Sequence, residues 1–140
     1  MAEHNRIGHI GEEKAVDLLQ KKGYNILETN WRMGHLEVDI IASYNNEIIF
    51  VEVKTRTSSI GRTPEEAVDE NKKRHLTAAA NAYIKYKKET RNLRFDVVGI
   101  IINKDDEIVD IQHYENAFVP SGRFRTNGSF TSGWLWKRRK

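Results

Sequence analysis

The first apolar pattern in the chain has the spacing of a helix. Over residues 7–22, apolar side chains recur every three or four positions, which places them along one stripe of an α-helix. Gly23 follows, and glycine is common just past a helix C-terminus because it adopts positive φ at little cost. The pattern therefore predicts a helix over 7–22 that ends at Gly23. Its apolar stripe consists of Ile7, Ile10, Ala15, Leu18 and Leu19.

Two acids near the start of this helix differ in direction. Glu12 lies in line with Val16 and Leu19, at the margin of the apolar stripe, whereas Glu13 points away from it. We expect Glu12 to reach the neighbouring sheet and Glu13 to face water. An ordinary first-turn acid that favours the helix dipole remains the alternative for both.

Strand-like segments follow, and turns rich in glycine and asparagine separate them. The predicted strands are 24–31, 36–42 and 48–54, with turns at 32–35 and 43–46. A tight turn joins the second strand to the third, so these two should be antiparallel neighbours. The start of the second strand then lies beside the end of the third.

The third strand carries an acid and an amine at its carboxyl end. Its β-branched and aromatic residues predict burial on both faces. A period of two places Glu52 and Lys54 on one face with Ile48 and Phe50. The carboxyl end of such a strand is where open α/β sheets bind ligands. A salt-bridged strand end that leaves the core is the alternative.

The second strand brings further carboxylates to the same place. Strict alternation puts Glu37, Asp39 and Ile41 on one face, with Val38 and Ile40 on the other. In the antiparallel arrangement, Glu37 and Asp39 come close to the acid and the amine of the third strand. We therefore expect three carboxylates and one lysine to converge at one end of the sheet.

The second helix has a clear start signal. Thr63 is the expected N-cap, Pro64 takes the first helical position, and Glu66 completes a capping box. The helix is expected to run to about Lys88. Lys72 interrupts its apolar stripe and either extends past its neighbours into water or points toward a ligand on the sheet. The stripe itself consists of Val68, His75, Leu76, Ala79 and Tyr83.

The remaining elements complete an α/β fold of order α-β-β-β-α-β-β. Strands are expected over 93–103 and 108–114, which gives a central mixed sheet of about five strands flanked by helices. We expect one α/β domain over residues 1–115. Residues 116–140 are expected to be an irregular basic tail, in which Trp134 and Trp136 either anchor the segment or stack on a base.

Composition narrows the chemistry. The chain has no cysteine, which excludes disulfides and thiolate zinc sites and agrees with a cytoplasmic location. No apolar run is long enough to span a membrane. The net charge of +3 permits nucleic-acid binding without demonstrating it. Basic side chains that suit phosphate contacts, or an ordinary solvated surface, are Arg32, Arg56, Arg62, Lys72, Lys73 and Arg74.

The converging carboxylates suit a hard divalent cation. Asp39 and Glu52 offer oxygen ligands, and Mg²⁺ commonly binds one or two carboxylates, several waters and a phosphate. A metal ion there could activate water and stabilise charge on phosphorus. Lys54 could orient the water or stabilise the same charge, and Glu12 could complete the acidic shell.

The ordered set of these motifs resembles the PD-(D/E)xK nuclease superfamily, whose members have the restriction-endonuclease-like fold. Over residues 8–100 the chain is similar to a bacterial family of predicted endonucleases, which is itself similar to archaeal Holliday-junction resolvases. The motifs that carry the resemblance are Gly11-Glu12, Asn30-Trp31-Arg32, Glu37–Ala42, Phe50–Arg56, Ala67-Val68, Lys72, Tyr83 and Phe95–Val98.

The resemblance implies a metal-dependent endonuclease acting on DNA, with branched or structured DNA as the substrate. It implies that Asp39 and Glu52 bind Mg²⁺, for which Mn²⁺ can substitute, and that Lys54, Glu12 and Glu37 are catalytic. A homodimer would suit a substrate with two strands to cut. Two alternatives stay open: a nuclease fold that binds DNA or a DNA-processing partner without cutting, and a structural carboxylate–lysine network in a protein-interaction domain.

Overall fold

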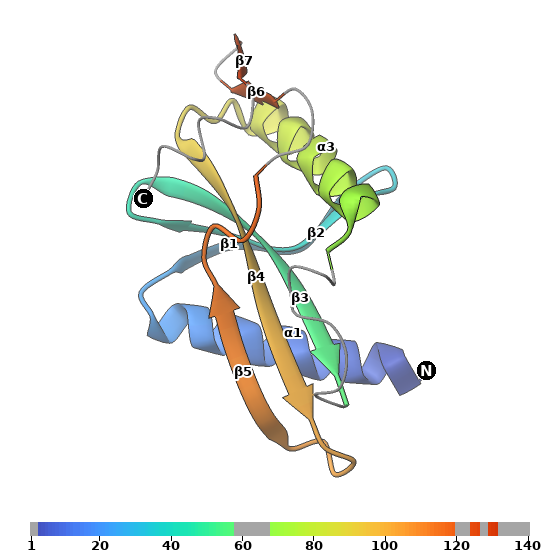
Figure 1. Ribbon diagram of the computed structural model, residues 1–140. Coiled ribbons are helices and arrows are strands. Elements are labelled where there is room, and N and C mark those ends of the chain that lie inside the picture. Colours follow the sequence, from blue (N-terminus) through green and yellow to red (C-terminus); the bar gives the residue numbers. More distant parts are fainter. Residues whose placement is uncertain (1–2, 58–67, 120–123, 127–128, 132–140) are drawn as a thin grey trace.

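A single five-stranded sheet with one helix on each face forms the body of the protein (Figure 1). The computed structural model describes residues 3–57, 68–119, 124–126 and 129–131. This arrangement confirms the predicted α/β fold and its order α-β-β-β-α-β-β. The elements are α1 (Glu3–Lys21), β1 (Asn25–Met33), β2 (Leu36–Tyr44), β3 (Glu47–Arg56), α3 (Glu70–Lys87), β4 (Asn92–Ile102) and β5 (Ile108–Tyr114), followed by β6 (Phe124–Thr126) and β7 (Ser129–Thr131).

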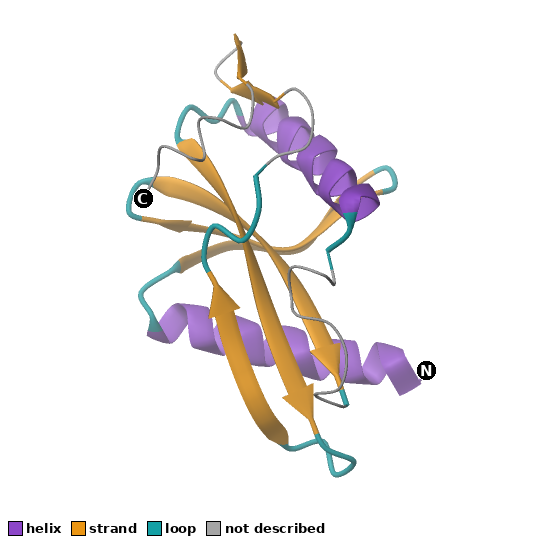
Figure 2. Ribbon diagram, viewed as in Figure 1, coloured by secondary structure: helices purple, strands orange, loops and turns teal. Residues whose placement is uncertain are grey.

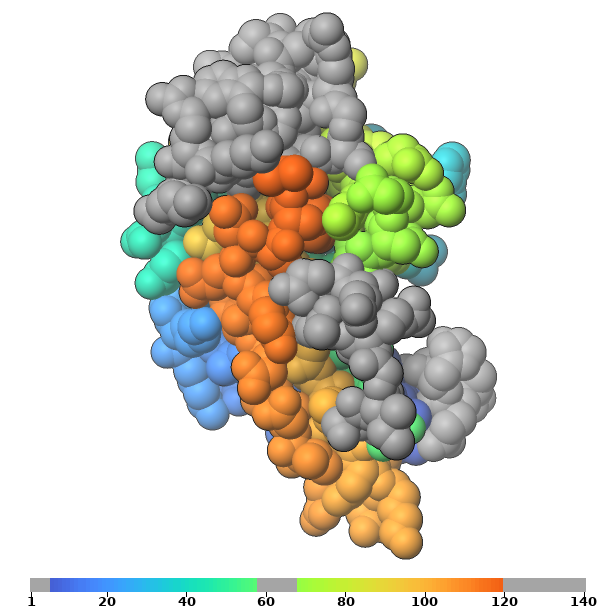
Figure 3. Space-filling view, in the orientation of Figure 1, coloured from blue at the N-terminus to red at the C-terminus, as the bar shows by residue number. Residues whose placement is uncertain are grey.

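The strands lie in the order β1-β2-β3-β4-β5, and only the β3–β4 pair is parallel. Antiparallel neighbours follow from the short turns, whereas the parallel pair needs a crossover, which contains α3 (Figure 2). The edge strand β5 continues along the outside of the sheet to the β4–β5 turn, which projects at the lower end of the space-filling view (Figure 3). The mixed sheet is therefore as predicted.

Strands β6 and β7 form a separate two-stranded antiparallel sheet inside the segment predicted to be irregular. Weak periodicity over three residues per strand carries little signal for such a hairpin. The division of the chain at residue 115 stays a prediction. Neither helix combines the length and apolar character that a membrane crossing requires, over the part of the chain that the structure describes.

Helix α1 begins at Glu3, earlier than its apolar stripe predicted, and ends where expected. The extra residues are polar, and a polar segment continues a helix without needing a buried face. Arg6, in this extension, pairs with Asp106 in the β4–β5 turn. Gly23 has a φ of +95°, and the backbone N–H of Tyr24 donates to the carbonyl of Leu19. The predicted glycine stop is confirmed.

Helix α3 begins later than its sequence signal suggested. Its N-cap is Asp69, whose side chain accepts a hydrogen bond from the backbone N–H of Lys72. The predicted start at Thr63, with Pro64 and Glu66, lies outside the described residues. Val68 is buried but precedes the helix, so its expected place on the helical stripe is wrong. The stripe residues Leu76, Ala79 and Tyr83 are buried as predicted, and His75 is half-buried.

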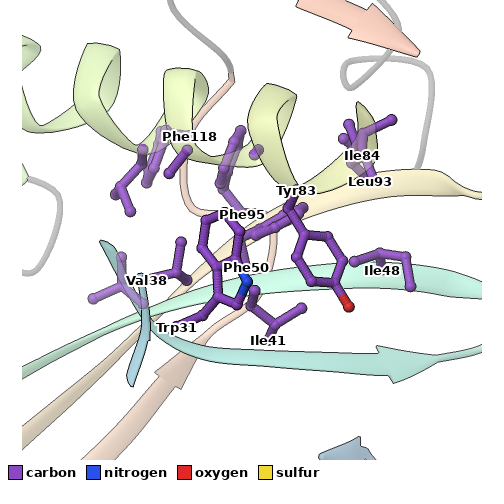
Figure 4. Close-up of a cluster of buried hydrophobic side chains, with 14 of the residues drawn as sticks. Trp31, Val38, Ile41, Ile48, Phe50, Tyr83, Ile84, Leu93, Phe95 and Phe118 are labelled. Atoms are coloured by element: carbon purple, nitrogen blue, oxygen red, sulfur yellow. The ribbon is translucent and has the colours of Figure 1, made fainter. Parts of the chain in front are cut away.

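Large aromatic side chains fill the space between α3 and the sheet (Figure 4). The ring of Tyr83 meets the rings of Trp31 and Phe50 edge-on, with centroids 5.4 and 5.7 Å apart. Phe95 and Phe118 stack with their centroids 4.9 Å apart. Edge-on and offset contacts of this kind are the favoured aromatic geometries. They fix α3 over β2 and β3, above the strand ends that carry the acids.

Helix α1 packs on the other face and approaches β3 closely at Gly11. A Cβ atom built on Gly11 would lie 1.8 Å from Oγ1 and 2.9 Å from Cβ of Thr55. Threonine is short and branched, so it cannot move far enough to make room. The absence of a side chain at Gly11 therefore sets the distance between α1 and the end of β3.

We expect Gly11→Ala to destabilise the protein by about 2 kcal/mol or more because α1 must move away from β3. Gly8→Ala, on the same helix, has no atom within 4 Å of the added Cβ. This control should be neutral or more stable by up to about 1 kcal/mol, since alanine favours helix. Urea unfolding of both variants measures the difference, and equal stabilities would contradict the close approach.

A buried charge network joins Tyr24, which follows α1, to β4 and β5. Arg94 donates to both carboxylate oxygens of Asp96 at 2.9 and 2.8 Å, and to the hydroxyl of Tyr24. His113 contacts the same carboxylate through Nε2 at 2.7 Å, and the backbone N–H of Asn116 donates to it at 2.9 Å. Burial alone would raise the pKa of Asp96, but the hydrogen bonds from His113 and Arg94 hold it below its ordinary value.

Asp96→Asn should destabilise the protein by about 3 kcal/mol or more at pH 7 because it leaves a buried arginine underneutralised. The lowered pKa means that this stabilisation is present above the ordinary aspartate value of 3.8 and is lost as the pH falls below it. The thermal unfolding temperature should therefore fall more steeply between pH 7 and pH 3 in the wild type than in Asp96→Asn. Asp110→Asn, at an exposed position of β5, is the control and should change little.

Candidate functional site

Strand β2 breaks its alternation at Asp39. Val38 packs in the core under α3 together with Ile41, whereas Ile40 packs in the core under α1. Residues three apart share a face only where a strand is irregular between them. The prediction that Val38 and Ile40 share one face is therefore wrong. From the β2–β3 turn, the pairing of the two strands extends as far as Ile40 and Val51, so it stops one residue short of Asp39.

The Asp39 carboxylate takes over where the backbone ladder stops. Its Oδ2 accepts a hydrogen bond from the backbone N–H of Val53 at 2.8 Å. On the other side, β1 pairs Thr29 with Ile40 and Trp31 with Val38, which leaves Asn30 opposite Asp39. Asn30 has a φ of +52°, a left-handed conformation that asparagine tolerates better than most residues. The irregularity thus crosses β1, β2 and β3 at one level.

Asn30 also connects the sheet to α1. A hydrogen bond from its side chain to Glu12 lowers the pKa of this glutamate, although burial and the charge of Asp39 raise it overall. Glu12 is half-buried and reaches the sheet, as its helical position predicted. Glu13 is exposed and pairs with His9 at 3.3 Å. Asn30 was given no role from sequence; an asparagine inside a strand was the available signal.

Glu52 lies on the face of the sheet that α3 covers, together with Ile48 and Phe50, whose face it was predicted to share. Its side chain is only 11% exposed, and Oε2 lies 3.5 Å from Nζ of Lys72. Burial, and then the charge of Asp39, raise the pKa of Glu52 to about 7, against the opposing effects of Lys72 and Lys54. Burial also raises the pKa of Asp39, against the hydrogen bond from Val53. Two carboxylates that resist joint ionisation therefore lie side by side.

Lys54 and Glu37 complete the cluster. Lys54 is exposed at the end of β3 and acts electrostatically on both Asp39 and Glu52. Glu37 pairs with Arg32 at 3.0 Å, and its charge raises the pKa of Asp39 and Glu12. The three carboxylates and one lysine expected to converge act on one another electrostatically, and Glu12 from α1 is the fourth acid of the cluster. Their catalytic and metal-binding roles stay predictions.

The predicted nucleic-acid-binding residues are more scattered. Lys73 pairs with Glu70 at 3.5 Å, and Arg74 donates to Asn71 on the same helix. Arg56 is half-buried within β3, so the loop predicted to begin at residue 55 begins after it. Arg62 lies outside the described residues. Their contact with nucleic acid stays a prediction, as it does for Arg32 and Lys72.

The number of protein ligands at this site limits how a metal ion could be bound. Within the described ranges, no three or more histidine and acidic side chains are grouped closely enough to hold one. Asp39 and Glu52 offer two hard oxygen ligands, so most of the coordination shell would come from water and substrate. Mg²⁺ is often bound in this way, by one or two carboxylates with phosphate oxygens. The residues present fit such an ion.

The buried charge of Glu52 should make this site unstable by itself. Its pKa of about 7 exceeds the ordinary value of 4.5, so ionisation disfavours the folded state above pH 4.5, with the full effect above pH 7. We expect Glu52→Gln to raise the unfolding free energy by about 1–2 kcal/mol at pH 8 without metal. The gain should shrink as the pH is lowered toward 5. Urea unfolding at both pH values measures it, and a loss of stability at pH 8 would contradict it.

Comparison with known proteins gives a family. Residues 11–100 match the uncharacterised protein family UPF0102. A UPF0102 protein of Bacteroides thetaiotaomicron is 43% identical over 120 residues, covering 86% of this chain and 98% of the relative. One of Parabacteroides distasonis is 45% identical over 118 residues, covering 84% and 96%. One of Porphyromonas gingivalis is 42% identical over 118 residues, covering 84% and 87%. The chain therefore belongs to the family UPF0102.

Proposed function

We propose that the protein is a metal-dependent endonuclease of the PD-(D/E)xK superfamily, with the restriction-endonuclease-like fold, which hydrolyses phosphodiester bonds in DNA. The observation that carries the proposal is the gathering of Asp39, Glu52 and Lys54 where β2 and β3 part. A structural ion pair needs one acid and one base, whereas this site buries two acids beside each other. Burial of that kind is disfavoured unless a cation joins them.

In the reaction, the oxygen of water bonds to phosphorus and gives up a proton, one phosphorus–oxygen ester bond breaks, and the leaving alkoxide takes up a proton. Asp39 and Glu52 would hold Mg²⁺ or Mn²⁺, and the bound ion would lower the pKa of water and offset charge on the phosphate. The backbone hydrogen bond from Val53 holds the Asp39 carboxylate in one orientation. Glu52 is held differently, by the ion pair that its Oε2 makes with Nζ of Lys72 at 3.5 Å.

The other side chains act around this pair. Lys54, exposed at the end of β3, is free of the core and can orient the water or stabilise charge on phosphorus. Glu12 has a raised pKa, which suits a group that accepts and returns a proton. Asn30 holds Glu12 toward the sheet, and Glu37 holds Arg32 beside the site. The resemblance supports the roles of Lys54 and Glu12, and Glu12 matches the helix acid of the resolvase-like branch of the superfamily.

DNA is the proposed partner, with branched or structured DNA as the preferred form and the cytoplasm as the place of action. The resemblance to Holliday-junction resolvases supports this preference, and it also supports a homodimer, since a four-way junction has two strands to cut. Basic residues that would contact the phosphates are Arg32, Arg56, Arg62, Lys72, Lys73 and Arg74. Binding without cutting is the second candidate, favoured by the ion pair that Lys72 makes with Glu52.

A cleavage assay separates these functions. The protein is incubated with Mg²⁺ or Mn²⁺ and labelled single-stranded, duplex, flap and four-way-junction DNA at one fixed salt concentration, because phosphate contacts depend strongly on salt. We expect metal-dependent cutting that falls by about 100-fold or more in Asp39→Ala and Lys54→Ala, which remove metal binding and charge stabilisation.

A matched pair on α1 serves as the control. Glu12→Ala should lose activity, whereas Glu13→Ala, whose side chain is 71% exposed, should keep it. DNA binding that persists in every variant, with no cutting under either metal, would replace the nuclease with the binding module. Neither cutting nor binding would instead favour a protein-interaction domain.

A further inference from the structure

Lys72 is the main positive charge acting on the two central carboxylates. Its Nζ lies 3.5 Å from Oε2 of Glu52, and the Glu52 side chain is 11% exposed. It lowers the pKa of both Glu52 and Asp39, and its effect on each is larger than that of Lys54. The lysine from α3 therefore neutralises the acid pair more than the lysine on β3 does.

The position of Lys72 in its helix is unfavourable for a positive charge. It lies in the first turn of α3, where the helix dipole disfavours a positive side chain. Its backbone N–H donates to the N-cap carboxylate of Asp69 at 2.9 Å, which fixes the first turn of the helix around it. The side chain is 37% exposed, so it keeps a route to solvent. A lysine held in this way can exchange one anionic partner for another.

We propose that Lys72 is a resident counter-ion that competes with the divalent metal for Asp39 and Glu52, and that a DNA phosphate draws it away. This inference rests on the proposed function and adds its regulation. Without DNA, the metal ion must displace an ammonium group from the acid pair, so it binds weakly. With DNA, the ammonium group of Lys72 pairs with a phosphate instead, and the two carboxylates become available to the metal.

The competition follows from charge balance. A divalent ion alone neutralises two ionised carboxylates. If the ammonium group of Lys72 stays beside them, the site carries excess positive charge, which a phosphate offsets. Metal and DNA should thus each strengthen the binding of the other, as linkage requires. The competition keeps metal occupancy low until a substrate is bound, which limits cutting of DNA that contacts the protein only transiently.

The test measures Mn²⁺ binding by electron paramagnetic resonance, with and without a short duplex DNA, at one salt concentration. We expect Lys72→Met to bind Mn²⁺ on the order of ten-fold more tightly than the wild type without DNA. DNA should tighten Mn²⁺ binding in the wild type and much less in Lys72→Met. Lys72→Arg keeps the charge and should behave as the wild type does.

Lys87→Met is the matched control. Lys87 also lies on α3 and pairs across to the sheet, with its Nζ 3.6 Å from Oε2 of Glu28. It should leave Mn²⁺ binding unchanged. Circular dichroism of each variant checks that α3 remains folded, so a change in affinity is not a change in fold.

The outcomes separate the two proposals. If the wild type and Lys72→Met bind Mn²⁺ equally well, and Asp39→Asn loses this binding, the proposed competition is overturned. The nuclease proposal is unaffected by that outcome. Weaker binding in Lys72→Met overturns the competition as well, because the lysine would then be supporting the metal. No Mn²⁺ binding in any variant, with or without DNA, overturns both the competition and the metal-dependent nuclease.

Discussion

The hydrogen bond from the backbone of Val53 to the carboxylate of Asp39 is the interaction on which the site depends. It stands where the β2–β3 ladder ends, and it allows the two strands to part without leaving a buried N–H unpaired. Beyond this bond the acids gather around Asp39, with Glu52 from β3 and Glu12 from α1. A regular ladder at this level would pair the backbone of Val53 with β2 and would leave the Asp39 carboxylate without this partner.

The two hydrophobic cores position this cluster of acids from opposite faces of the sheet. Gly11 lets α1 approach Thr55 closely enough for Glu12 to reach the sheet. The aromatic side chains under α3, with Tyr83 against Trp31 and Phe50, fix the helix that carries Lys72. Each helix therefore brings one charged side chain to the same strand ends. The two charges are opposite, and the acid pair lies between them.

Periodicity predicted most of the fold because it reports burial, which the sheet and helices obey. It placed β5 at its observed residues and Gly23 at its observed role. It failed where a local interaction outweighs burial. Alternation placed Val38 and Ile40 on one face, whereas they pack in opposite cores. The strand is irregular between them, at Asp39, where a side-chain hydrogen bond follows the end of the ladder, and no spacing rule contains that bond. The left-handed Asn30 and the ion pair of Lys72 depend equally on contacts between distant segments.

The buried network around Asp96 has a consequence for how the sheet assembles. His113 meets Asp96, the partner of Arg94, only when β4 and β5 pair in one register. A slip of one residue would turn His113 to the other face and remove one hydrogen bond from the buried Asp96. The network thus favours the observed register of the edge strand over a shifted one, because only that register satisfies the buried charges.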